Sequence, residues 1–171
     1  PFTVSEVNVQ ISKMKINKAP GWDEITAEHL KYSGPVFRAL LTWVYNEIVL
    51  MENIPDYFKK GLIVSIPKPG KSYVVKENNR GITLLPVFYK VFEMLILQRE
   101  HSWFENTLDE LQGAAQENCS CQHTSLMMQE AISYNLDLGE SVYGALCDIM
   151  KAFDSVWIDG LLFKLHEYGI D

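Results

Sequence analysis

The sequence predicts an α+β fold that is rich in helices. Several segments repeat apolar residues at the three- and four-residue intervals of an amphipathic helix. Two short apolar runs flank a turn-rich stretch at residues 67–71, which predicts a hairpin. A third apolar run, residues 142–147, has the length of a buried strand and stops at Asp148. We therefore expect helices, one hairpin and one further strand.

The composition is that of a chain able to bury a hydrophobic core. Of its 171 residues, 47% are hydrophobic, which suits one domain or part of a larger one. The net charge of −7 argues against a protein that coats nucleic acid with its whole surface. The basic charge is nevertheless concentrated, because residues 59–80 hold six Lys or Arg against the single acid Glu77, a local net charge of +5.

The cysteines and the hydropathy pattern limit the other classes of protein. Cys119 and Cys121, with His123, would supply half of a zinc site, but no second ligand pair follows at a set distance, and Cys147 lies in the apolar run. We expect reduced thiols in an intracellular protein. No apolar stretch has the length of a membrane span, and the start has no signal-peptide pattern. The missing initiator Met and the end soon after Gly169 suggest a piece of a longer chain.

The first 51 residues predict three helices. Thr3 and Glu6 form a capping box that opens a helix ending near Lys15. Residues 17–23 contain a Pro-Gly pair and predict a loop that connects helices. A short helix follows over residues 27–33, and a proline at the first helical position opens a longer one that ends near residue 51. Trp43 and Tyr45 lie in its apolar face, so we expect them to pack in the core and not to stack on bases.

The next stretch predicts the hairpin. Residues 61–66 and 81–85 are the expected strands, and residues 67–71 are the turn. Lys68, Lys71 and Arg80 suit a polyphosphate, with the lysines as point charges and the arginine as a bidentate donor. A solvated basic loop explains the same residues equally well, since there is no Gly-rich phosphate loop.

The remaining elements lead to Asp148. We expect a helix over residues 87–104, a loop over 111–124, a helix over 125–138, the strand over 142–147, and a helix through 160–165 that ends at Gly169. A carboxylate at a strand end faces solvent or a cleft and can hold a divalent metal ion. Spacing alone favours the plainer interpretation of a solvated acid, because a single aspartate lacks partner ligands.

Four stretches together carry a resemblance that covers nearly the whole chain. They are NKAPGWDEITAEHLK at residues 17–31, IPKPGKSYVVKENNRGITLLPVFYKVFEMLILQR at 66–99, LDELQGAAQENCSCQHTS at 108–125 and LCDIMKAFDSVWIDGLLFKLHEYGI at 146–170. In this order and spacing they resemble the reverse transcriptases of non-LTR (LINE-type) retrotransposons.

The resemblance implies the fingers and partial palm of a right-hand polymerase. Residues 1–171 would be a partial reverse transcriptase domain, with residues 1–110 mainly fingers and 111–171 the first half of the palm. The implied activity is RNA-directed DNA polymerisation, the transfer of dNTPs to a DNA 3′-OH on an RNA template with two Mg²⁺ ions. A non-catalytic nucleic-acid-binding remnant and a group II intron maturase-like enzyme are the alternatives.

The resemblance also implies roles for single residues. Asp148 matches the family's first metal-binding aspartate, and the backbone carbonyl of Ile149 would assist the second metal. Phe153 matches the steric gate that excludes a ribose 2′-OH. Lys68, Lys71 and Arg80 match residues that grip the triphosphate of the incoming nucleotide.

The implied partners are the RNA template, the DNA primer or target DNA, dNTPs and the rest of the retrotransposon polyprotein, with no membrane. The implied location is the nucleus and cytoplasm. Two positions depart from the family pattern: residues 112–115, QGAA, lack its aromatic residue, and Gly81 replaces a frequent proline. The family's paired-aspartate turn does not occur in the sequence, so we expect this chain alone to be inactive.

Overall fold

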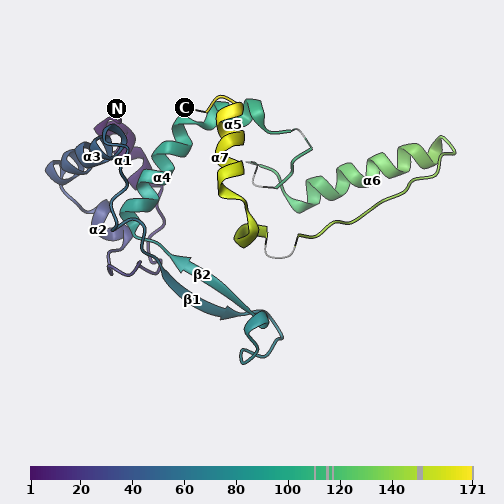
Figure 1. The fold of residues 1–171 in the computed structure, drawn as a ribbon, viewed down its shortest axis with the longest axis horizontal. Helices are drawn as coiled ribbons and strands as arrows, with labels where there is room; N and C mark the ends of the chain where they lie inside the picture. The colour runs from purple at the N-terminus through teal and green to yellow at the C-terminus, as the bar shows by residue number, and fades with distance from the viewer. Residues whose placement is uncertain (110, 115, 117, 150–151, 171) are drawn as a thin grey trace. The chain divides into compact units, whose positions relative to one another are not determined.

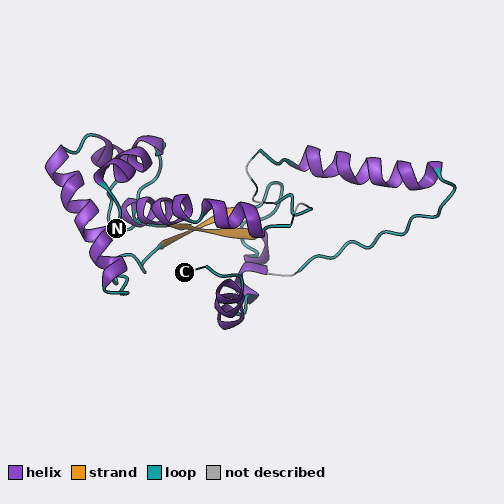
Figure 2. Ribbon diagram, turned by 90° about the horizontal axis from the view of Figure 1, so that it is seen from above, coloured by secondary structure: helices purple, strands orange, loops and turns teal. Residues whose placement is uncertain are grey.

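The computed structural model describes residues 1–109, 111–114, 116, 118–149 and 152–170. They divide into two compact units, Pro1–Arg99 and Glu100–Asp171. The first unit contains, in order, α1 (Val4–Lys13), α2 (Ala27–Lys31), α3 (Pro35–Leu50), β1 (Leu62–Pro67), a short 3₁₀ helix (Lys76–Asn78), β2 (Asn79–Leu84) and α4 (Val87–Arg99). Figure 1 labels the helices and strands, and Figure 2 distinguishes helices from strands by colour.

The first unit is built around a core of buried apolar side chains. Apolar faces of α1, α3 and α4 supply most of it, as their helical spacing predicts. Several rings surround Phe92: the ring of Tyr45 lies 5.5 Å away, that of Phe58 6.1 Å and that of Phe2 6.2 Å between centroids. The buried members are Phe2, Val7, Ile11, Leu30, Leu41, Tyr45, Ile48, Phe58, Val87, Val91, Phe92 and Leu95.

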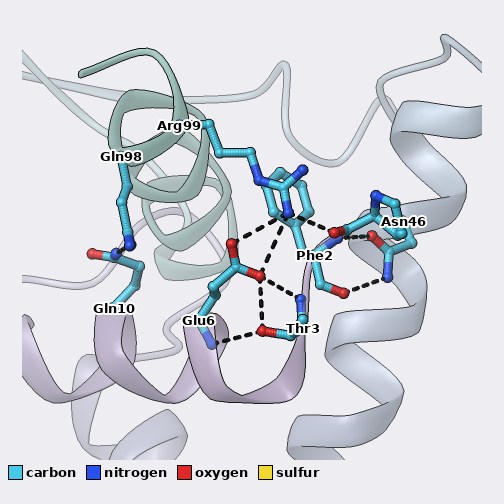
Figure 3. Close-up of polar contacts among 8 residues, drawn as sticks. Phe2, Thr3, Glu6, Gln10, Asn46, Gln98 and Arg99 are labelled. Atoms are coloured by element: carbon cyan, nitrogen blue, oxygen red, sulfur yellow. Dashed lines mark hydrogen bonds and ion pairs between the residues drawn. The ribbon is translucent and has the colours of Figure 1, made fainter. Parts of the chain in front are cut away.

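Polar contacts join the ends of α1 and α4 (Figure 3). The expected capping box is confirmed, since the Thr3 hydroxyl accepts from the Glu6 N–H at 3.2 Å and the Glu6 carboxylate accepts from the Thr3 N–H at 2.6 Å. Arg99, at the end of α4, forms an ion pair with the same carboxylate at 3.2 Å. The hydrogen bonds from Thr3, and then Arg99, hold the pKa of Glu6 below its usual value.

The loop between α1 and α2 does more than connect helices, because it packs against the chain that follows β2. A Cβ atom at Gly21 would lie 2.8 Å from the Pro86 nitrogen and 2.9 Å from the Leu85 carbonyl carbon, so only glycine fits without a shift. The Asp23 carboxylate accepts a hydrogen bond from the Tyr57 hydroxyl. The Pro-Gly turn of this loop is thus explained by a close backbone approach.

The predicted hairpin is confirmed. β1 and β2 pair antiparallel from Leu62 opposite Leu84 to Pro67 opposite Asn79. The hairpin projects from the helices of its unit, with its tip farthest from them (Figure 1). Most residues of both strands are exposed, so the two strands lie outside the hydrophobic core of the unit.

The second unit contains α5 (His101–Thr107), α6 (Cys121–Asp137), a 3₁₀ helix (Ala152–Ser155) and α7 (Ile158–Glu167). The indole N–H of Trp103 donates to the Tyr168 carbonyl at 2.8 Å, which ties α5 to the end of α7. The predicted glycine stop is confirmed, because Gly169 follows α7 with φ +78°. Across the described part of the chain, no helix is both long and apolar enough to cross a membrane.

The strand expected over residues 142–147 is wrong. Residues 140–149 have no regular secondary structure and are exposed, with Leu146 fully so. A strand needs a hydrogen-bonded neighbour, and the sheet of the described residues contains only β1 and β2. The apolar content of the run therefore does not make a strand here, and Cys147 is exposed instead of enclosed.

Other differences concern helix bounds and one side chain. The helix expected over residues 87–104 ends at Arg99, and α5 begins at His101. The helix expected from residue 125 begins at Cys121, because the Ser120 hydroxyl caps it by accepting from the His123 N–H. Tyr45 is buried as expected, but Trp43 is 57% exposed, so its assignment to the core is wrong.

Candidate functional site

A tight turn holds two of the predicted triphosphate-binding lysines. The Lys71 N–H donates to the Lys68 carbonyl at 3.1 Å, with Pro69 and Gly70 between them. Gly70 has φ +71°, so the sequence Lys-Pro-Gly-Lys shows the features of a type II turn. Such a turn brings the Cα atoms of its first and last residues within about 7 Å, which places Lys68 and Lys71 close together.

The strand register adds Arg80 to this pair. Ile66 lies opposite Arg80, and the Lys68 N–H donates to the Asn78 carbonyl at 2.7 Å, so the ladder continues one step beyond β1. Paired residues point to the same face of a ribbon, as do residues two apart along a strand. Lys68 and Arg80 are therefore diagonal neighbours, about 7–8 Å apart.

The side chains of Asn78 and Asn79 brace the tip. The Asn79 amide donates to the carbonyls of Tyr73 at 2.8 Å and Val75 at 2.9 Å, and the Asn78 amide donates to the Ser72 carbonyl at 3.1 Å. This role was not predicted from the sequence, although consecutive asparagines beside a turn are a recognised signal of side-chain to backbone bonding.

The cationic side chains of the hairpin differ in whether they form hydrogen bonds within the protein. The Lys68 ammonium donates to the Glu77 carbonyl at 2.8 Å, which uses one of its three protons. Within the described residues, the side chains of Lys71 and Arg80 form no hydrogen bond or ion pair. Both are exposed, and both can turn toward an anion.

Asp148, Ile149 and Phe153 lie in the second unit. Asp148 and Ile149 belong to the irregular segment 140–149, and both are exposed. Phe153 lies in the 3₁₀ helix Ala152–Ser155, and its side chain is 98% exposed. The structure therefore places the three hairpin cations in the first unit and the three other predicted residues in the second unit.

The residues at the predicted metal site fit Mg²⁺ in kind. A carboxylate and a backbone carbonyl at adjacent positions are both hard oxygen donors, which Mg²⁺ prefers. The described residues contain no group of three or more His, Cys, Asp or Glu side chains that could hold a metal ion. The donor set around Asp148 is thus suitable in type and incomplete in number.

Contacts among Trp22, Tyr57 and Lys60, near the base of the hairpin, were not predicted from the sequence. The indole of Trp22 meets the Tyr57 ring edge-on at 5.1 Å between centroids, and the Lys60 ammonium lies 5.5 Å from the indole centroid. Burial, followed by the hydrogen bond to Asp23, raises the pKa of Tyr57. These contacts fix the loop of residues 17–23 beside the start of β1.

A family model and several known proteins match this chain. The family model described as reverse transcriptase (RNA-dependent DNA polymerase) matches residues 66–171, from the end of β1 onward. A protein of Drosophila melanogaster named "Probable RNA-directed DNA polymerase from transposon X-element" is 34% identical over 170 residues, which are 98% of this chain and 19% of that protein.

Two further relatives are also named RNA-directed DNA polymerases. The "RNA-directed DNA polymerase from mobile element jockey" of Drosophila funebris is 32% identical over 96% of this chain and 18% of its own length. The protein of the same name from Drosophila melanogaster is 30% identical over 95% of this chain and 18% of its own length. The chain thus spans about a fifth of the length of these relatives. With the family model matching more than half of it, the chain belongs to the reverse transcriptase family.

Proposed function

We propose that this chain is part of an RNA-directed DNA polymerase that transfers deoxynucleotides to a DNA 3′-OH on an RNA template. The observation that carries the proposal is the position of Lys68, Lys71 and Arg80 on one hairpin, inside the region that the family model matches. The printed names of the relatives support the same activity. In this proposal residues 1–110 are mainly fingers and residues 111–171 the first half of the palm.

The proposed role of the hairpin is to bind the triphosphate of the incoming nucleotide. Arginine offers a rigid fork of donors to phosphate oxygens, and lysine offers a compact charge. The side chains of Lys71 and Arg80 are exposed and without partners among the described residues, so binding would break no ion pair there. Cations at this place would stabilise the negative charge that develops on the leaving pyrophosphate.

Asp148 and the Ile149 carbonyl are proposed as oxygen ligands of Mg²⁺, completed by carboxylates from outside the described residues. Mg²⁺ ions bound at such a site would lower the charge on the attacking and leaving oxygens. Phe153 is proposed to lie against the sugar of the nucleotide. Its exposed ring has the bulk to exclude a 2′-OH.

A non-catalytic role in binding nucleic acid is the second candidate, and one observation favours it. The basic tip is assembled within the described residues, whereas the set of metal ligands is not. Nucleic-acid binding without polymerisation would then be all that this chain does. Primer extension, described next, distinguishes polymerisation from nucleic-acid binding alone.

The test is primer extension on an RNA template with Mg²⁺ and dNTPs. We compare this chain with the longer parent polypeptide that carries it together with the part that follows in its relatives. The parent should extend the primer, and the chain alone should not, because the described residues bring no group of three metal-binding side chains together. Lack of extension by a folded parent would reject the proposed polymerase, and extension by the chain alone would reject the incomplete metal site.

Replacing Phe153 with valine in the parent should weaken its discrimination against ribonucleotides. The smaller side chain leaves room for the 2′-OH, and the ratio of kcat/KM for dNTP over rNTP should fall about 10- to 200-fold, the range for a single steric group. Single-nucleotide incorporation measures the ratio. Phe163→Val on α7 is the matched control, since that ring is also largely exposed, and an equal change in both variants would remove Phe153 from the sugar site.

A further inference from the structure

The hairpin tip exposes an apolar segment between two lysines. In the sequence Lys71-Ser-Tyr-Val-Val-Lys76, which we call the tip segment, Tyr73 is 75% exposed and Val74 is 77% exposed. Contiguous apolar exposure on a projecting element is a feature of interaction sites. The proposed function assigns no role to Tyr73 or Val74, so this exposure is unexplained by triphosphate binding.

Hydrogen bonds within the hairpin hold the backbone of the tip segment. The asparagine brace holds the carbonyls of Ser72, Tyr73 and Val75, and the Val74 N–H donates to the Ser72 hydroxyl at 3.4 Å. In the described part of the chain, the ring and the hydroxyl of Tyr73 make no contact with another ring, cation or hydrogen-bonding group. A preorganised backbone that presents a free ring reduces the entropy lost on binding.

The charge around the ring identifies the kind of partner. Lys71 and Lys76 are the two ends of the tip segment, Lys68 and Arg80 lie just beyond it, and Glu77 is the single acid from residue 59 to residue 80. Single-stranded nucleic acids bind to surfaces that combine such cations with an aromatic ring, because phosphates pair with the cations while a base stacks on the ring.

We propose that Tyr73 is a stacking platform for an unpaired base of single-stranded RNA, with Lys76 binding an adjoining phosphate. The inference extends the proposed function, on which it rests, by adding a contact to the template strand. β1 and β2 carry this contact away from the helical core, because six strand residues span about 20 Å. RNA bound there would lie beyond the α1–α4 core, along the exposed ribbon (Figure 1).

The test measures binding of the whole 171-residue chain to a fluorescent, unstructured RNA oligonucleotide by anisotropy. Tyr73→Ala should weaken binding about 5- to 150-fold, the range for one base–aromatic stack, and Tyr73→Trp should restore it. The salt slope should stay unchanged in Tyr73→Ala, whereas Lys76→Gln should reduce it by about 0.7. With an abasic strand of the same length, Tyr73→Ala should bind as well as the unaltered chain.

Tyr32→Ala is the matched control, since Tyr32 is 81% exposed at the end of α2, outside the tip segment. Equal losses in Tyr32→Ala and Tyr73→Ala, equal losses on normal and abasic strands, or no RNA binding by the unaltered chain would each overturn the inference. A loss of affinity for vesicles with anionic phosphatidylserine, without a loss for RNA, would assign Tyr73 to a lipid surface and also overturn it. Primer extension by the parent tests the proposed polymerase separately, so the two failures are distinguishable.

Discussion

Replacing Asp148 with asparagine in the parent polypeptide is expected to lower kcat for primer extension at least about 1,000-fold. The substitution keeps the shape of the side chain and removes the negative charge that a divalent metal ion needs. Loss of a metal ligand removes several kcal/mol of transition-state stabilisation, and each 1.36 kcal/mol is a factor of ten in rate. Single-turnover extension at saturating dNTP measures the effect on chemistry.

The exposure of Asp148 makes this experiment easy to interpret. The side chain is exposed in an irregular segment, so its replacement should leave folding unchanged. Asp159→Asn is the matched control, because Asp159 is also exposed and lies in the first turn of α7. The control should retain activity within about twofold. If Asp148→Asn polymerised as fast as the unaltered parent, the catalytic assignment of this carboxylate would be wrong.

Local signals in the sequence were sufficient for the elements of the first unit. The Thr3–Glu6 capping box and the proline that opens α3 marked two helix starts, and both are where the sequence predicts them. The hairpin followed from a Pro-Gly turn between two apolar runs. Each of these features depends on interactions between residues close in sequence, which periodicity and turn chemistry record.

Features that depend on distant contacts were not predictable in the same way. The run at residues 142–147 has strand composition, but strand formation depends on a neighbouring strand that composition does not specify. The exposure of Trp43 depends on how α3 packs, because a wide apolar face does not reveal which part of it is covered. Gly21 was visible as a turn residue, whereas its approach to Leu85 and Pro86 required the fold.

The candidate site likewise has features that the sequence predicts and features that required the structure. The identities of Lys68, Lys71 and Arg80 came from charge and resemblance, whereas the turn that joins Lys68 to Lys71 and the register that places Arg80 opposite Ile66 required the structure. The display of Tyr73 depends on bonds from Asn78 and Asn79 to carbonyls four to six residues away. The sequence does not specify those bonds, because an asparagine side chain in a turn can reach several backbone groups.

Tyr45→Ala is expected to cause the largest loss of stability in the first unit, about 3–5 kcal/mol in the free energy of unfolding. The Tyr45 side chain is 0% exposed and packs against Phe92, so its truncation leaves a cavity in the core. Its hydroxyl also donates to the Phe88 carbonyl at 2.8 Å, and burial raises the pKa of Tyr45, which keeps the donor proton in place. A loss of this size is a large share of a typical domain stability of about 5–15 kcal/mol.

Two further variants divide this loss between packing and hydrogen bonding. Tyr45→Phe keeps the ring and should cost only about 1 kcal/mol for the lost hydrogen bond, whereas Trp43→Ala, on the exposed side of the same helix, should cost less than about 1 kcal/mol. Urea denaturation followed by circular dichroism gives the three values if the m-values agree. If Trp43→Ala were as destabilising as Tyr45→Ala, the face of α3 that packs against α4 would be different from the one described. Tyr45→Ala should therefore lower the free energy of unfolding far more than Tyr45→Phe or Trp43→Ala. A cavity beside Phe92 costs more than the loss of one hydrogen bond or the removal of an exposed ring.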